Sequence, residues 1–70
     1  MIHYVKTFHC MHVPTGKRWE YSFTEENAAL FGSEFSEERG IESDIALRIV
    51  NHWNYMASTH NSTGNRYWLV

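Results

Sequence analysis

Residues 13–17, with the sequence VPTGK, constrain the fold more than any other segment, because they predict a tight reversal between two strands. Residues 2–13 and 17–23 alternate polar and apolar side chains, the two-residue period of a β-strand. Pro14 presets the backbone at the first turn position, and Gly16 accepts the left-handed conformation that a three-residue turn with a bulge requires. The sequence therefore predicts a β-hairpin.

The predicted register places Val13 opposite Lys17, and it decides which side chains share a face of the hairpin, because a shift of one residue exchanges the faces of a strand. The expected core face carries Val5, Thr7, His9, Met11, Val13, Trp19, Tyr21 and Phe23. The expected outer face carries Tyr4, Lys6, Phe8, Cys10, His12, Arg18, Glu20 and Ser22. Its apolar row of Tyr4, Phe8 and Cys10 is unusual for a solvated face, so we expect something to cover it.

Two helices and a last strand follow the hairpin. Thr24, followed by two glutamates, is typical of a helix start, and Gly32 is expected to end this short helix. Residues 33–40 can form a helical turn or a loop. From Ser43 to about Ser58, apolar side chains recur with the 3.6-residue period of a helix. Residues 66–70 read as a closing strand.

These elements predict an α+β fold. Seventy residues are enough for one domain at most, so residues 1–70 are expected to form a single compact domain. The element order is ββααβ, a β-hairpin, a short helix, the main helix and a C-terminal strand. We expect a three-stranded antiparallel sheet in the order 2-1-3, with the helices on one face.

The net charge of −2 hides a strong separation of charges along the chain. Seven of the eight acidic side chains lie within residues 25–44, where Arg39 is the only basic one. Acidic residues are common at helix N-termini and in solvated loops. The same acidic segment is also suited to steering the protein toward a basic partner. Both interpretations remain open at this stage.

Catalytic and metal-binding motifs are not evident. A structural zinc site needs four ligands, and the chain has five histidines but only one cysteine, Cys10. Cys10 and His12 share a face of the predicted strand, but no group is evident that would orient them or stabilise an oxyanion. We therefore predict no enzyme activity, no metal site and no cofactor.

The N-terminal residues alternate and lack the apolar stretch of a signal peptide, and a lone cysteine suits a reducing compartment. No apolar run approaches the length of about 18 residues that crosses a bilayer. We therefore expect a cytoplasmic protein without membrane association.

The function expected from these features is that of a small non-enzymatic protein-binding module that docks through the outer sheet face and the acidic segment. Proteins of this size without catalytic motifs are common among accessory and inhibitor proteins of phages and mobile elements, and a homodimer is a further expectation. The predicted partner-binding residues are Tyr4, Phe8, Cys10, Arg18, Trp68, Glu34, Glu37, Glu38 and Glu42. The alternative is binding of single-stranded nucleic acid by the aromatic and basic side chains of the outer face.

Overall fold

The computed structural model describes residues 2–61 and 64–69. In chain order its elements are β1 (Tyr4–Val5), β2 (Thr7–His12), β3 (Lys17–Ser22), α1 (Glu25–Leu30), β4 (Ile41–Glu42), α2 (Ser43–Met56), the π-helical turn η1 (Ala57–Asn61) and β5 (Asn65–Trp68). The predicted α+β class and the three-stranded antiparallel sheet are confirmed. Val70, the last residue of the predicted closing strand, lies outside the described residues.

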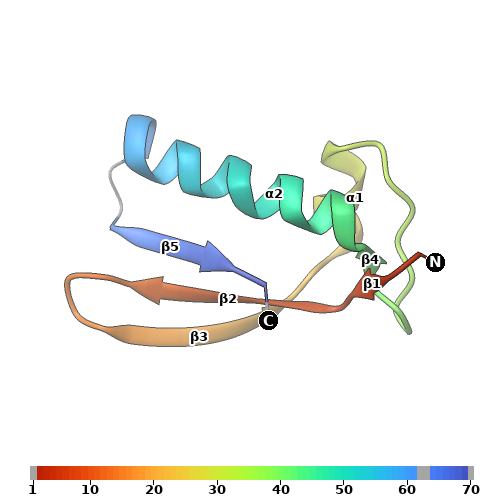
Figure 1. The fold of residues 1–70 in the computed structure, drawn as a ribbon, viewed down its shortest axis with the longest axis horizontal. Helices are drawn as coiled ribbons and strands as arrows, with labels where there is room; N and C mark the ends of the chain where they lie inside the picture. The colour runs from red at the N-terminus through yellow and green to blue at the C-terminus, as the bar shows by residue number, and fades with distance from the viewer. Residues whose placement is uncertain (1, 62–63, 70) are drawn as a thin grey trace.

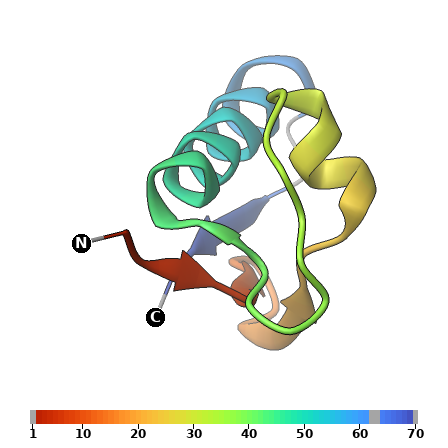
Figure 2. The ribbon, with the colours of Figure 1, turned by 90° about the vertical axis from the view of Figure 1, so that its right-hand side faces the viewer.

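The strand order in the main sheet is β3-β2-β5, so the C-terminal strand lies beside the first strand of the hairpin. Both helices lie on the same side of this sheet (Figures 1 and 2). The predicted element order is not matched in detail. The predicted first strand divides into β1 and β2, and β1 pairs with β4 in a separate two-stranded sheet.

Lys6 interrupts the first strand, and this break changes which side chains face the core. Its carbonyl accepts a hydrogen bond of 2.9 Å from the Phe23 amide. Val5 and Phe8 both pack in the core although they are three residues apart, which an unbroken two-residue alternation does not allow. Gly40 crosses directly over this segment with a φ of +88°, and a Cβ there would collide with the Val5 carbonyl oxygen.

The predicted hairpin is present, but its register is wrong by one residue. His12 pairs with Lys17, so the connecting loop has four residues rather than three. The Gly16 amide donates to the His12 carbonyl at 2.8 Å, with Gly16 in the left-handed conformation that the sequence predicted. The Val13 amide donates instead to the Gly64 carbonyl at 2.8 Å, which removes Val13 from the hairpin pairing.

The longer loop exchanges the two faces of β2, because successive side chains of a strand point to opposite sides. Phe8 and Cys10 turn toward the helices and are only 7% and 4% exposed. The prediction that these two residues lie on the outer face is therefore wrong. Phe8 and Cys10 thus face the chain's own helices.

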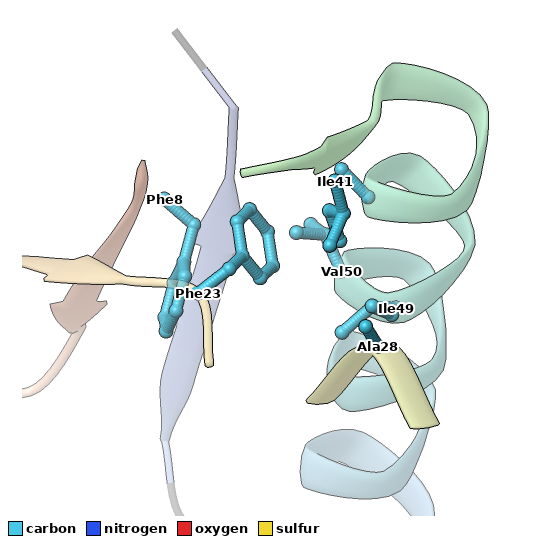
Figure 3. Close-up of a cluster of buried hydrophobic side chains, with 7 residues drawn as sticks. Phe8, Phe23, Ala28, Ile41, Ile49 and Val50 are labelled. Carbon is cyan, nitrogen blue, oxygen red and sulfur yellow. The ribbon is translucent and has the colours of Figure 1, made fainter. Parts of the chain in front are cut away.

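α1 begins and ends for the reasons that the sequence suggested, whereas Ser43, expected as the N-cap of the main helix, is the first residue of α2, and its N-cap Glu42 makes no side-chain capping bond. Thr24 and Asn27 form a reciprocal capping box at the start of α1, and Gly32 follows its last turn with a φ of +66°. The apolar stripe of α2 is buried at Ala46, Ile49 and Val50. In Figure 3 these helices face Phe8 and Phe23 from the sheet, which completes the core.

Candidate functional site

The main sheet is covered unevenly by its helices. α2 contacts β5 and reaches Phe8 of β2 through Trp53, whereas all six residues of β3 are exposed. A helix is about 10 Å across and neighbouring strands are about 4.8 Å apart, so one helix covers about two strands. The third strand, β3, is left without a helix above it.

An open groove of about 840 Å³ lies between β3 and α2. Trp19 and Tyr21 of β3 line one side, and they are 41% and 48% exposed. Trp53 of α2 lines the other side, and its ring centroid is 4.8 Å from that of Phe8 at the base. Because aromatic rings form both walls and the base, the groove presents an apolar aromatic surface. We call it the aromatic groove.

The polar part of the aromatic groove lies at the hairpin end. His12, Thr15 and Lys17 line it there, and His12 Nδ1 is 2.9 Å from Thr15 Oγ1. None of the described side chains that line the groove is acidic. The rim of the groove is thus neutral to basic, and the acidic segment lies elsewhere.

Cys10 lies at the base of the groove, between the exposed strand β3 and the strand β5 that α2 contacts. It pairs with Trp19 of β3 on one side and with Tyr67 of β5 on the other. Burial raises the pKa of the Cys10 thiol, and a hydrogen bond with the Tyr67 side chain lowers it by less. The thiol therefore stays protonated near neutral pH. This protonation disfavours a nucleophilic role, which needs the thiolate.

The edge of β5 is closed by a side chain. The Asn54 Nδ2 donates to the Tyr67 carbonyl at 2.8 Å, and the Tyr67 amide donates to Asn54 Oδ1, also at 2.8 Å. The amide side chain thus makes the two hydrogen bonds that a further strand would make. A blocked edge of this kind opposes pairing with another chain.

The edge of β3 is open. The bond from Phe23 to Lys6 sets the alternation of the β2–β3 ladder, so the backbone groups of Ser22, Glu20 and Arg18 point away from β2. Among residues 2–61 and 64–69, no strand pairs with β3 on that side. These three N–H and C=O pairs can therefore accept a strand from another polypeptide.

The predicted site residues fall into four separate places. Phe8 and Cys10 are in the core and at the base of the groove, while Arg18 and Trp68 are on the outer face. Tyr4 is 43% exposed on β1, opposite Glu42 of β4, and the Arg39 guanidinium lies 4.9 Å from its ring centroid. The remaining predicted residues, Glu34, Glu37 and Glu38, are exposed on the segment between α1 and β4.

The outer face of the sheet carries a second set of side chains. Arg18, Met11 and Arg66 form one row across the three strands, and Glu20, His9 and Trp68 form the next. The His9 ring stacks on Trp68 with 5.8 Å between centroids, and His9 Nε2 lies 3.3 Å from the Glu20 carboxylate. No helix of the described chain covers this face (Figure 1).

Sequence reasoning missed the aromatic groove because it treated Trp19 and Tyr21 as ordinary core residues. It placed both side chains on the correct side of the sheet, and the structure confirms that placement. The prediction did not take the width of the sheet into account, since one long helix does not cover three strands. Trp53 belongs to the apolar stripe of α2 and contacts Phe8 and Tyr67.

No protein family, curated protein or solved structure matches this chain. In the described residues, no helix is long and apolar enough to cross a membrane. The same residues contain no group of three histidine, cysteine or acidic side chains placed to hold a metal ion. The case for a function therefore depends on the surfaces described above.

Proposed function

We propose that this protein is a small non-enzymatic binding module that takes up an extended segment of a polypeptide along β3. The observation that carries the proposal is the exposure of all six β3 residues beside the aromatic groove. An added strand would find backbone hydrogen-bonding groups at Arg18, Glu20 and Ser22. Its alternate side chains would enter the groove, which is how strand addition combines affinity with specificity.

The groove supports this role better than the outer face does. Trp19 and Tyr21 are large, exposed aromatic side chains, the residue type that contributes most to binding at protein interfaces. The outer face loses Phe8 and Cys10, two of the three apolar side chains of its predicted row, to the core. An accessory or inhibitor role for such a module, and steering by the acidic segment, remain predictions.

Capture experiments with matched variants test the proposal. We expect Trp19→Ala to abolish capture of polypeptide partners by the immobilised protein, as identified by mass spectrometry. Leu30→Ala is the control, because Leu30 is an exposed apolar side chain, 74% accessible, at the end of α1 and outside the groove. Equal capture by the wild-type protein and the Trp19 variant would contradict a role for the groove.

The outer face favours a second candidate, binding of single-stranded nucleic acid. The Arg18–Met11–Arg66 row lies next to the His9–Trp68 stack, and single-strand binders combine basic groups with aromatic platforms. This candidate predicts affinity for a labelled oligothymidylate that falls steeply with salt and with Arg66→Ala. Lack of binding at low salt would eliminate it.

A further inference from the structure

The sequence of β3 is complementary to itself. When two copies of β3 are placed antiparallel with Trp19 at the centre, the basic Arg18 of each copy lies opposite the acidic Glu20 of the other. We propose that the polypeptide bound along β3 is a second copy of this chain, and that the two β3 strands pair antiparallel about a two-fold axis at Trp19. This inference rests on the proposed function, because it names the partner of the same edge.

The backbone allows only a few registers for this pairing. The groups that point away from β2 belong to the even-numbered residues Arg18, Glu20 and Ser22, and only such residues can exchange hydrogen bonds across the new ladder. A two-fold axis perpendicular to the sheet also keeps both sets of helices on one side. The charged pairings at the centre are then Arg18 with Arg18, Arg18 with Glu20, or Glu20 with Glu20, and a centre nearer Ser22 pairs at most three residues of β3.

Charge selects one register from these three. Pairing Arg18 with its own copy, or Glu20 with its own copy, opposes like charges at the centre of the interface. Pairing Arg18 with Glu20 of the second copy opposes unlike charges twice, once on each side of the axis. Cross-strand pairs of opposite charge stabilise a sheet, and like charges directly opposite destabilise it.

The helix side of the interface fits the same register. Trp19 meets Trp19 of the second copy at the axis, in a pair without backbone hydrogen bonds, where side chains approach most closely. Lys17 lies opposite Tyr21 of the second copy, which places an ammonium group next to an aromatic ring on each side. The two exposed aromatic residues of β3 are thus buried together with Lys17, the basic residue on the same face.

The arrangement of the helices leaves room for this dimer. α2 contacts β5, the strand farthest from the β3 edge, so it does not obstruct a second copy at β3 (Figure 1). The two copies form one six-stranded sheet. The outermost strands of that sheet are the two β5 strands. Asn54 closes the edge of each at Tyr67.

Charge reversal tests the pairing in solution. We expect sedimentation equilibrium to show a dimer for the wild-type protein. Arg18→Glu or Glu20→Arg alone should raise the dimer dissociation constant about tenfold or more, because each creates two pairs of like charges. The double variant Arg18→Glu/Glu20→Arg should restore the dimer. Circular dichroism checks that each variant is folded, since both side chains are exposed.

A cross-link tests the register. In a Cys10→Ala background, Trp19→Cys should form a disulfide-linked dimer on mild oxidation, because the two residues at position 19 face each other at the axis. Lys17→Cys is the matched control, since in the proposed register its two copies lie roughly 14 Å apart along the strands. Equal cross-linking at both positions, or none at position 19, would overturn the register.

The outcomes separate this inference from the proposed function. A wild-type protein that is monomeric at every concentration, yet captures other polypeptides through Trp19, contradicts the second copy as partner and leaves the binding module standing. A dimer that is insensitive to both charge reversals places the interface elsewhere and overturns the inference. A monomer that captures nothing contradicts both.

Discussion

The two edge strands of the main sheet, β5 and β3, differ in almost every respect although both pair with β2. β5 is packed under α2, and its Tyr67 backbone is hydrogen-bonded to the Asn54 side chain on the free side. β3 has no helix above it and no strand beyond it in the described chain, and its aromatic side chains face an open groove. The comparison shows that one half of the sheet is packed against α2 and the other half is exposed, which is why we propose the exposed half as the binding site.

The largest expected effect comes from the two tryptophans that line the aromatic groove. Trp53 contacts Phe8, Phe23 and Tyr67, so Trp53→Ala should lower the free energy of unfolding by about 3 kcal/mol or more. Trp19→Ala should lower it by under about 1 kcal/mol, because that side chain is exposed on a strand without a helix. Chemical denaturation at concentrations where the chain is monomeric measures both.

Equal losses from the two tryptophan variants would break the comparison between the strands. The protein would then depend on the β3 side chains for its stability as much as on those under α2. The groove would have to close around Trp19 in the isolated chain.

A smaller effect is expected from the side chain that closes β5. Asn54→Ala removes two hydrogen bonds from the Tyr67 backbone and should lower the free energy of unfolding by about 2 kcal/mol. Hydrogen exchange at the Tyr67 amide should become faster. Asn51→Ala is the control on the exposed side of α2, with an expected change within about 0.5 kcal/mol. Unchanged exchange at Tyr67 would show that Asn54 does not protect this edge.

The smallest effect concerns Cys10, which lies on β2 between the two edge strands of the main sheet. Burial raises the pKa of its thiol, so the unfolded chain loses the thiol proton at a lower pH than the folded chain. The resulting stability is present below the ordinary thiol pKa of about 8.5 and is lost as the pH rises through the folded value. In alkaline solution, the unfolding free energy of the wild-type protein should therefore fall relative to that of Cys10→Ala. A constant difference up to strongly alkaline pH would contradict the raised pKa.

Much of the fold could be predicted from local signals. The capping residue Thr24, the turn glycine Gly16 and the apolar stripe of α2 each specify a short stretch of backbone by nearby contacts, and each is present. The hairpin register could not be predicted in this way. Residues 13–16 suit a loop of three or four residues, and the choice depends on Val13 donating to Gly64, a contact about fifty residues away in the chain.

The break at Lys6 had a similar origin. It depends on Gly40 crossing over Val5 and on the pairing of β1 with β4, neither of which has a local signature in the N-terminal segment. The one-residue error in the hairpin register then affected the predicted site, because it placed Phe8 and Cys10 on the wrong face. Arg18, which does lie on the outer face, belongs to a strand whose faces were predicted correctly, and Trp68 of β5 lies on the same face.

The closed edge at Asn54 also bears on how large an assembly can grow. A sheet with two open sides can join head to tail, β3 of one molecule against β5 of the next, and such contacts repeat without limit into fibres. Asn54 occupies the β5 edge at Tyr67, so in the proposed dimer the two β3 edges are left to pair and the association stops at two. In that proposed assembly, a single asparagine separates a finite pair from an open-ended filament.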